Sequence, residues 1–473
     1  MLTLADVLEA LTTTRPANAT MVITEAQVDS RQVIPGALFV ALPGERVDGH
    51  NYIGDAFHRG ANLALVSKDV SNLFPVIDIR SGKVDAEQTI PTLPFCLRVE
   101  DTLKALQQIA RFWRRKLDLR VVGITGSVGK STTKELIAEV LSTRYRTLRN
   151  PGNLNNEIGL PLTILRLGSG YERAVLEMGF YVPGEIAFLC DIAQPQIGVI
   201  TNIGTVHAER AGTQEEIARG KAELIQSLPP SPEGIAILNF DDPWVRPMAA
   251  QTHARVFYYG LDPQADLWAD GVQGLGLEGI RFRLHYRNEV IHLRIPLIGR
   301  HSVHTALRAA AVGLAEGLAW QEIAAGLRIG HTQLRLVAVY SQTGALILDD
   351  TYNASPESTM AALNLLSELE GRRIAVLGDM LELGIYEQQG HEMVGARVAE
   401  VANELIAVGP LSAITAQAAE QAGMPASAVT WVQNTEQAIP ILQKRLGKGD
   451  VVLVKGSHGM RMDAIVAALE ANS

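Results

Sequence analysis

The sequence has little cysteine and no long apolar run. Only two of its 473 residues are cysteine, Cys96 and Cys190. Two thiols cannot build a disulfide framework or a zinc site made of thiolates, which fits a reducing compartment. No apolar segment reaches membrane-spanning length, and the first residues lack the basic start and apolar run of a signal peptide. We therefore expect a cytoplasmic protein without a membrane span.

Positive charge is also scarce. The chain has 42 lysines and arginines against 51 aspartates and glutamates, a net charge of −9. This balance argues against broad nucleic-acid binding, so any handling of phosphates must come from local features. Proline, glutamine and serine are not in excess, and 47% of the residues are hydrophobic, as in globular proteins. At 473 residues the chain is too long for one core, and about three domains are expected.

Short β-branched segments alternate with helical ones, which predicts an α/β fold with mostly parallel sheets. We expect a small α/β domain over residues 1–97, a central domain over 98–330 and a C-terminal Rossmann-like domain over 331–473. The amphipathic segment 102–117 predicts the helix that opens the central domain, and residues 262–294 predict antiparallel strands. The other expected strands lie within 37–44, 61–67, 120–126, 173–179, 197–204, 234–239, 344–350, 372–379, 404–409 and 450–457.

A glycine-rich loop lies within residues 121–135, VVGITGSVGKSTTKE. The strict G-x-x-x-x-G-K-[ST] pattern would need a glycine two residues before Gly126. A buried strand nevertheless runs straight into glycines, a lysine, a hydroxyl and a helix, which is the context of a phosphate-binding loop. Gly126 and Gly129 permit a tight turn whose N–H groups face one phosphate, and the helix N-terminus adds positive charge. We infer a nucleotide site of the shorter G-x-x-G-K-S form, in which Lys130 reaches the β- and γ-phosphates and Ser131 ligates Mg²⁺.

Together with this loop, further segments resemble the Mur ligases, the ATP-dependent amide-forming enzymes of peptidoglycan synthesis. The resemblance covers nearly the whole chain and is closest to the members that add D-alanyl-D-alanine to a UDP-N-acetylmuramoyl tripeptide. The segments are DSRQVIPGALFVALPGERVDGH (29–50), NPGNLNNEIGLPLTIL (150–165), LEMG (176–179), GEI (184–186), TNIGTVHAE (201–209), KAEL (221–224), GRHSVHTALRAAA (299–311), DDTYNASPEST (349–359), GDMLELG (378–384) and VLVKGS (452–457).

The resemblance implies a reaction and a separate role for each domain. ATP would activate the tripeptide carboxylate as an acyl phosphate, with Mg²⁺ between the anionic groups, and the product would be the pentapeptide. The N-terminal domain would bind the UDP-sugar substrate and the central domain ATP. The C-terminal domain would bind the dipeptide and close on ATP. The partners would be these small molecules, with no nucleic acid, no membrane and a monomeric chain.

Three residues are candidates for metal binding besides Ser131. Glu177 ends one expected strand and His207 follows the next, where an α/β sheet presents side chains to its crevice. Alone, they could equally be a strand-end cap and a loop imidazole. The resemblance implies that both are magnesium ligands and that Lys221, as a carbamate, holds a second Mg²⁺. An unmodified, ion-pairing Lys221 is the alternative.

The resemblance assigns the remaining contacts residue by residue. Ser30 and Arg31 would bind the uridine diphosphate sugar, although a polar turn explains them as well. Asp379 and Glu382 would line the D-alanyl-D-alanine pocket, unless GDMLELG is ordinary core. The expected ATP-binding residues are Gly126, Ser127, Val128, Gly129, Lys130, Ser131, Thr132, Asn156, Arg335, Asp350 and Asn353.

The chain departs from the family pattern in three places. Thr305 stands where the family has asparagine, which puts one adenine contact in doubt. Leu334 replaces the glycine before Arg335, and His458 replaces an arginine.

Two other functions stay open. A sister ligase adds the third, dibasic amino acid and shares the DSR segment, but its DNPR motif is absent from this sequence. A P-loop switch protein would hydrolyse nucleotide only to change shape.

Overall fold

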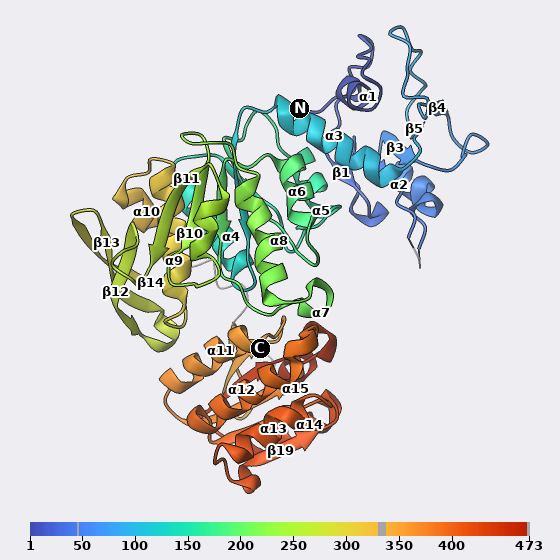
Figure 1. Cartoon of the computed structure of the whole chain (residues 1–473). Coiled ribbons are helices and arrows are strands. Elements are labelled where there is room, and N and C mark those ends of the chain that lie inside the picture. Colours follow the sequence, from blue (N-terminus) through green and yellow to red (C-terminus); the bar gives the residue numbers. More distant parts are fainter. Residues whose placement is uncertain (45–46, 330–336, 471–473) are drawn as a thin grey trace. The chain divides into compact units, whose positions relative to one another are not determined.

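The computed structural model describes residues 1–44, 47–329 and 337–470 (Figure 1). By their contacts the residues form two compact units. The first contains Met1–Gly123, Tyr145–Gly179 and Ile186–Ile197, and the second contains Ile124–Arg144, Phe180–Glu185 and Gly198–Ser473. None of the described helices is long and apolar enough to cross a membrane.

The first unit contains a five-stranded sheet in the order β1-β2-β3-β5-β4, whose pairings are all parallel. The strands of this sheet are β1 (Ala26–Gln27), β2 (Leu38–Val40), β3 (Leu63–Val66), β4 (Val76–Asp78) and β5 (Phe95–Arg98). The unit also contains β7 (Thr147–Arg149) and β8 (Arg173–Glu177), which belong to a nine-stranded sheet. Its helices are α1 (Leu4–Thr12), α2 (Ile53–His58), α3 (Thr102–Lys116), α5 (Gly159–Leu165) and α6 (Glu185–Ala193), of which α6 begins at the unit's edge.

Helix α3 confirms the predicted amphipathic segment. The Asp101 side chain accepts from the N–H groups of Leu103 and Lys104, so the helix begins with an N-cap. Three cations in its last turn complement the helix dipole. Its Thr102 hydroxyl donates to the carbonyl of Ala41, beyond β2. Because α3 is tied to the first sheet in this way, a domain boundary at residue 97 stays a prediction.

The second unit contains most of the chain. Its strands are β9 (Ile197–Ile200), β10 (Ile235–Asn239), β11 (Arg255–Gly260), β12 (Leu267–Gly274), β13 (Ile280–Tyr286), β14 (Glu289–Ile295), β15 (Val337–Tyr340), β16 (Leu346–Asp350), β17 (Arg372–Gly378), β18 (Glu404–Val408), β19 (Val429–Val432) and β20 (Asp450–Lys455). Its helices are α4 (Lys130–Ser142), α7 (Ala208–Ala211), α8 (Gln214–Gln226), α9 (Ser302–Ala315), α10 (Trp320–Leu327), α11 (Pro356–Glu368), α12 (Glu387–Val401), α13 (Ser412–Gln421), α14 (Thr435–Arg445) and α15 (Asp463–Leu469).

A nine-stranded sheet has the order β14-β13-β12-β11-β10-β9-β6-β8-β7, and its strand β6 (Arg120–Thr125) feeds the glycine-rich loop. Strands β10, β11 and β12 pair in parallel, whereas β12, β13 and β14 pair antiparallel. The predicted mostly parallel sheet with antiparallel strands after residue 262 is therefore confirmed.

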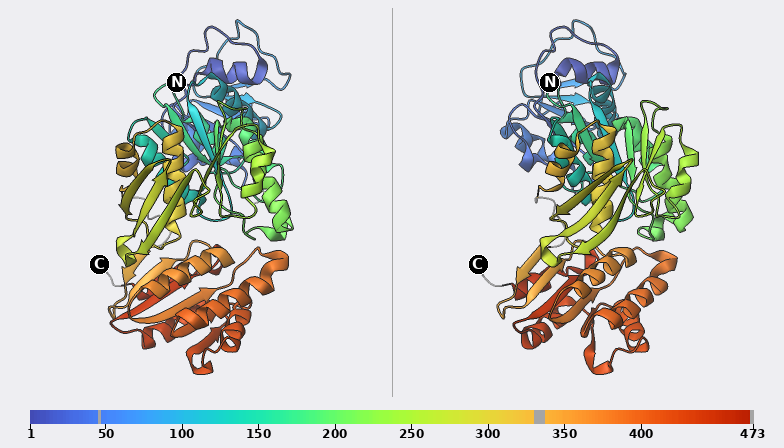
Figure 2. Two further views of the ribbon diagram at one scale, coloured as in Figure 1. Left: turned by 60° about the vertical axis from the view of Figure 1, so that its left-hand side comes forward. Right: turned by 90° about the vertical axis from the view of Figure 1, so that its left-hand side faces the viewer.

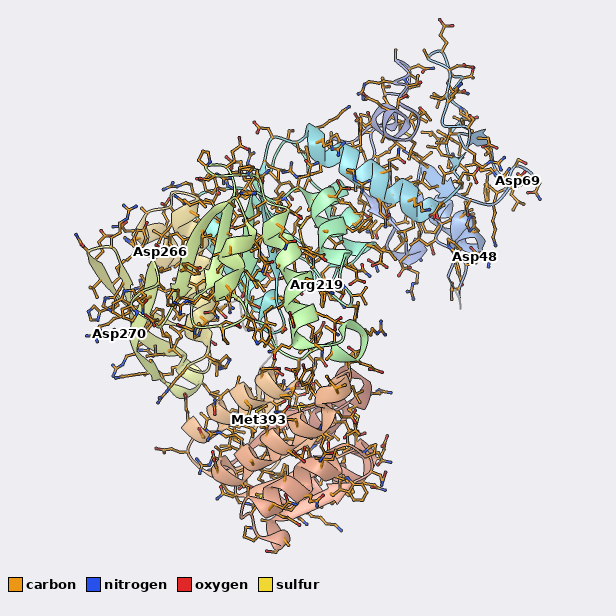
Figure 3. All side chains as sticks on the ribbon, in the orientation of Figure 1. Asp48, Asp69, Arg219, Asp266, Asp270 and Met393 are labelled. Atoms are coloured by element: carbon orange, nitrogen blue, oxygen red, sulfur yellow. The ribbon has the colours of Figure 1, made fainter. Side chains whose placement is uncertain are left out.

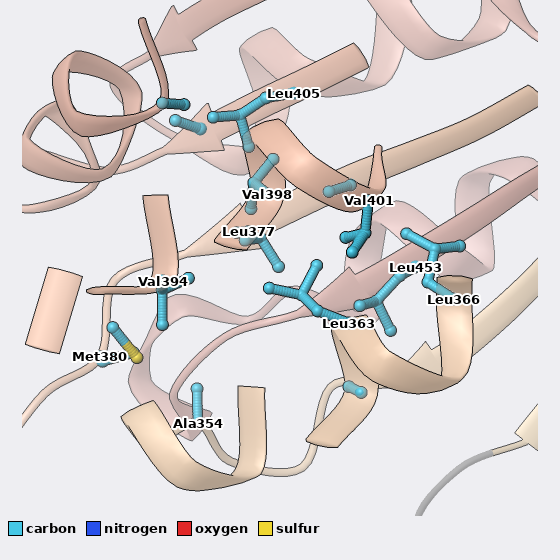
Figure 4. Close-up of a cluster of buried hydrophobic side chains, with 14 of the residues drawn as sticks. Ala354, Leu363, Leu366, Leu377, Met380, Val394, Val398, Val401, Leu405 and Leu453 are labelled. Carbon is cyan, nitrogen blue, oxygen red and sulfur yellow. The ribbon is translucent and has the colours of Figure 1, made fainter. Parts of the chain in front are cut away.

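The six-stranded sheet has the order β15-β16-β20-β17-β18-β19, and helices cover both of its faces (Figure 2). Neighbouring residues of one strand enter opposite cores, because side chains alternate along a strand. Leu348 packs in the cluster with α11 and α12 shown in Figure 4, whereas Ile347 packs with α14 and α15. This two-sided burial explains the near-continuous apolar strands and gives the predicted Rossmann-like architecture.

Candidate functional site

The glycine-rich loop joins the end of β6 to the start of α4. Gly126 has φ +144°, and a Cβ at this position would lie 1.9 Å from Thr201 Oγ1. Gly129 has φ +81° and is the N-cap residue of α4. Asn202 fixes the turn, since its carbonyl accepts from Ser127 N–H and its Oδ1 from Val128 N–H. The loop is thus a pre-shaped turn before a helix N-terminus, as anion binding requires.

Two lysine side chains converge on one carbonyl oxygen of this loop. Lys130 Nζ donates to Gly126 O at 2.9 Å and to Ser127 O at 3.2 Å. Lys221 Nζ donates to Gly126 O at 3.0 Å. Burial, and then the charge of Lys130, hold the pKa of Lys221 well below its ordinary value. The sequence placed both lysines in one site, and the structure brings them together.

Lys221 points into the protein from α8. Its side chain is 1% exposed, whereas that of Arg219, two residues earlier and labelled in Figure 3, is 68% exposed. Residues two apart lie on opposite faces of a helix, so one faces solvent and the other the core. The Lys221 ammonium lies 4.5 Å from the centroid of the Phe180 ring. None of the residues described in the structure forms an ion pair with Lys221, so the ion-pairing alternative has no described carboxylate to support it.

His207 adopts a left-handed backbone, with φ +69°, at the start of α7. Its Nδ1 lies 2.7 Å from Glu382 Oε2, and Tyr181 packs edge-on against its ring. Burial lowers the pKa of His207, and the Glu382 carboxylate opposes this. A carboxylate on one ring nitrogen fixes the tautomer and directs Nε2 away from it, an arrangement common to metal-ligating histidines. Glu382, expected to contact the dipeptide, here orients His207.

Glu177, in the first unit, ends β8 and is 2% exposed. Its Oε1 accepts from Asn155 Nδ2 at 2.9 Å, and its backbone N–H donates to Asn150 Oδ1. Its Oε2 is buried and has no hydrogen-bond partner among the described residues. Asn156 instead accepts from the N–H of Gly159, the first residue of α5, at 2.8 Å. In the asparagine-rich turn, sequence reasoning therefore missed Asn155, the residue that contacts the candidate ligand.

The side chains of Glu177 and His207 carry atoms of the types that can bind a magnesium ion. A buried carboxylate oxygen without a partner is the hard ligand that Mg²⁺ prefers. His207 Nε2 makes no hydrogen bond with the described residues. Across residues 1–44, 47–329 and 337–470, no group of three or more His, Cys, Asp or Glu side chains gathers as a metal site. The expected set contains only two residues of these kinds, so Ser131, Glu177, His207 and Lys221 remain predicted ligands.

A pocket of about 190 Å³ in the second unit brings the loop together with the six-stranded sheet. Ser127, Val128, Gly129 and Thr132 line one part of it, and Asp350 and Asn353 another. Thr305, the departure from the family pattern, also lines it. Six of the residues expected to bind ATP therefore share one pocket.

Lys455 is a pocket residue to which sequence reasoning assigned no role. Its side chain is 2% exposed, and its Nζ donates to Asp350 Oδ2 at 2.7 Å and to Asn353 O at 2.8 Å. It thereby ties together Asp350 and Asn353, two of the expected ATP-binding residues. Its place in the VLVKGS segment was the available signal. Arg335 lies outside the described residues.

The predicted site for the UDP-sugar substrate contains one buried and one exposed residue. Ser30 is buried at the start of a short helical turn, and the Arg31 side chain is 83% exposed. Arg31 forms an ion pair with Asp29 and, as the largest cause, lowers the pKa of that carboxyl to about 2. The exposed guanidinium is free to reach a ligand, as binding would require.

Asp379 is buried, and its Oδ1 accepts from both the N–H and the hydroxyl of Ser412 at 2.7 Å. The next residues of GDMLELG are also held, because Met380 N–H donates to His391 Nε2 and Leu381 N–H to Ser457 Oγ. Asp379 therefore shapes this loop, and direct contact of Asp379 with a dipeptide stays a prediction.

Three family models match the chain in succession. They are the Mur ligase family catalytic domain over residues 22–114, the Mur ligase middle domain over 124–313 and the Mur ligase glutamate ligase domain over 334–458.

Curated relatives and solved structures match over almost the whole chain. The chain is 35% identical to UDP-N-acetylmuramoyl-tripeptide–D-alanyl-D-alanine ligase of Bacillus subtilis strain 168, covering 97% of this chain and 95% of that one. The crystal structure I of MurF from Acinetobacter baumannii has a TM-score of 0.83 at 30% identity, covering 98% and 97% of the two chains. The MurF ligase of Thermotoga maritima in complex with ADP has a TM-score of 0.76 at 28% identity, covering 94% and 96%.

Proposed function

The chain belongs to the Mur ligase family, and from this premise we propose that it is the ligase that joins D-alanyl-D-alanine to a UDP-N-acetylmuramoyl tripeptide. The carrying observation is the 35% identity, over 97% of this chain, to a relative named for that reaction. The products are the UDP-N-acetylmuramoyl pentapeptide, ADP and phosphate. We place the reaction in the cytoplasm, which suits two buried cysteines of which neither is in a disulfide.

The proposed reaction has two steps. An oxygen of the tripeptide carboxylate attacks the γ-phosphorus of ATP, which forms an acyl phosphate and releases ADP. The amine of D-alanyl-D-alanine then attacks the acyl carbon, phosphate leaves and the amine loses a proton. Because anionic groups must approach each other, the protein's main task is to position them and offset their charge.

In this proposal Lys130 exchanges its contacts with Gly126 O and Ser127 O for phosphate oxygens. These two carbonyls lie in the loop itself, so the ammonium already points along it. Asp350 and Asn353, held by Lys455, contact the nucleoside. Ser131, Glu177, His207 and a carbamylated Lys221 would hold Mg²⁺, which offsets charge between the γ-phosphate and the carboxylate when bound.

The proposed carbamate is supported by the environment of Lys221. A carbamate forms when the neutral amine attacks CO₂ and loses a proton, and burial favours the neutral amine because it lowers the pKa of Lys221. A carbamate exchanges the cation for oxygen donors, the ligands that Mg²⁺ prefers.

An assay of phosphate release tests the function. The proposal expects phosphate only when ATP, muramoyl tripeptide and D-alanyl-D-alanine are all present, with pentapeptide in equal amount. Phosphate release without either co-substrate identifies a nucleotide switch. A requirement for a single dibasic amino acid with the dipeptide precursor identifies the sister ligase.

A further inference from the structure

Arg308, on α9, is a buried arginine without a carboxylate partner. It is 4% exposed, and none of the described residues forms an ion pair with it. Its Nη2 donates to Thr305 Oγ1 at 2.9 Å, and its Nη1 lies 3.5 Å from the hydroxyl of Tyr259. Its Nε has no hydrogen-bond partner in the part of the chain that the structure describes. A buried charge without an ion-pair partner is costly, so this residue needs an explanation beyond packing.

Arg114, on α3, shows how the same chain treats a purely structural arginine. It is equally buried, at 4% exposed. Its guanidinium donates to four backbone carbonyls, those of Ala193, Leu117, Leu119 and Gln194, at 2.8–3.3 Å. Arg114 is thus satisfied by its surroundings, whereas Arg308 is not.

The position of Arg308 points to an anion. A Cβ built on Gly129 would lie 3.5 Å from Arg308 Nη2, with no other atom within 4 Å. The guanidinium is therefore beside the last glycine of the loop, one residue before the N-terminus of α4. Its partner Thr305 lines the same pocket as Gly129. A buried cation without an ion pair among the described residues thus lies next to Gly129, which lines this pocket.

We propose that Arg308 is a further nucleotide-binding residue whose guanidinium pairs with a phosphate group of bound ATP. A phosphate accepts hydrogen bonds from the planar guanidinium fork and supplies the counter-charge that the described residues do not give Arg308. Arginine only donates, so Thr305 Oγ1 acts as its acceptor and the Thr305 hydroxyl hydrogen remains to donate into the pocket. The inference rests on the proposed function only in taking ATP as the ligand.

Binding and unfolding of four variants test the inference. R308M removes the charge, R308K keeps a charge without the fork, T305V removes the acceptor, and R114M is the matched buried control. Calorimetry with ATP, ADP and adenosine, without the other substrates, reports affinity. Thermal unfolding of the same proteins without nucleotide reports stability.

We expect R308M to weaken ATP binding by about tenfold to a hundredfold, the worth of a hydrogen bond to a charged group, and to leave adenosine binding unchanged. Its unfolding temperature without ATP should stay equal or rise, because a costly buried charge is gone. R308K should lose part of the ATP affinity, and T305V less than R308M. R114M should unfold at lower temperature with ATP affinity unchanged.

The inference is overturned if R308M binds ATP as the wild type does and unfolds at lower temperature, because Arg308 is then structural. Equal losses in R308M and T305V overturn direct contact, since Arg308 would act through Thr305. If R308M does not fold, R308K decides: unchanged ATP affinity there overturns the inference, and a loss confined to ATP and ADP supports it. A wild-type protein that binds no ATP contradicts the proposed function instead.

Discussion

At the scale of single residues, the candidate site depends on how Lys221 is buried. Phe180 covers its ammonium, and this ring fits only because residue 220 is glycine. A Cβ on Gly220 would lie 2.2 Å from Phe180 Cε2. A glycine inside a helix is unfavourable by about 1 kcal/mol relative to alanine, so its presence in α8 is explained by this close packing.

Lys221→Ala should reduce ligation by at least about a hundredfold, because a group that offsets charge between reacting anions is lost. Acetate or formate should restore part of the activity, since a small carboxylate can occupy the space of the carbamate. Turnover measured with and without added carboxylates checks this. Lys104→Ala, at a side chain 82% exposed, is the control. Full activity in Lys221→Ala would leave the lysine with a structural role only.

The sequence motifs predicted the residues of the glycine-rich loop better than those of the asparagine-rich turn. Lys130 and Gly126 follow from a spacing whose physical demands are local. Asn155 and Asn156 are adjacent amides of one turn, and nothing local distinguishes them. Only the fold shows that Asn155 donates to Glu177 while Asn156 accepts from the N–H of Gly159. The pairing of His207 with Glu382, 175 residues apart in sequence, could not be predicted for the same reason.

At the scale of elements, the junction of β6, loop and α4 is the most constrained. Gly126→Ala would combine a disfavoured positive φ with a clash against Thr201, whose hydroxyl also donates to Val128 O. We expect a stability loss of more than about 1 kcal/mol and loss of ATP binding. Denaturant unfolding and nucleotide calorimetry check both effects. Gly168→Ala, where a Cβ would meet no atom within 4 Å, should leave both unchanged.

Helix α1 is joined to α3 by a buried carboxylate. Burial alone would raise the pKa of Asp6, but hydrogen bonds from Thr3, Arg15 and Lys116 outweigh it and lower the pKa. A carboxyl with a lowered folded pKa adds stability above its unfolded pKa, near 4, and loses it as the pH falls through the folded value.

Asp6→Asn should therefore destabilise the protein by about 2 kcal/mol at pH 7, since hydrogen bonds to charged groups are lost. The difference from wild type should shrink as the pH falls below about 4. Thermal unfolding across this range is the measurement, with the exposed Asp85→Asn as control. A difference that grows on acidification would contradict the assigned role of Asp6.

Long apolar segments and amphipathic helices followed from their periodicity, as did the antiparallel strands β12, β13 and β14. The short strands β4, β7 and β19 did not, because three or four residues carry too little pattern. Each of the three is the edge strand of its sheet, where pairing with a single neighbour decides the conformation.

At the scale of the whole molecule, two successive Mur ligase domains, the middle domain and the glutamate ligase domain, supply different parts of the pocket. Residues of the glycine-rich loop, of α9 and of the six-stranded sheet line one pocket, although they are more than 300 residues apart at the extremes, from Ser127 to Lys455. The sequence predicted six of the residues that line this pocket but assigned no role to Lys455. Which of them touch is set by long-range packing, which sequence spacing does not encode.

In the proposed reaction, ATP activates the tripeptide as an acyl phosphate before the dipeptide attacks. The most direct measurement uses a tripeptide substrate whose reacting carboxylate carries ¹⁸O, with mass spectrometry of the phosphate released. The mechanism predicts one ¹⁸O atom in phosphate for each pentapeptide formed, because that oxygen bridges the acyl carbon and phosphorus and leaves with phosphorus. Unlabelled phosphate accompanying the pentapeptide would contradict the account.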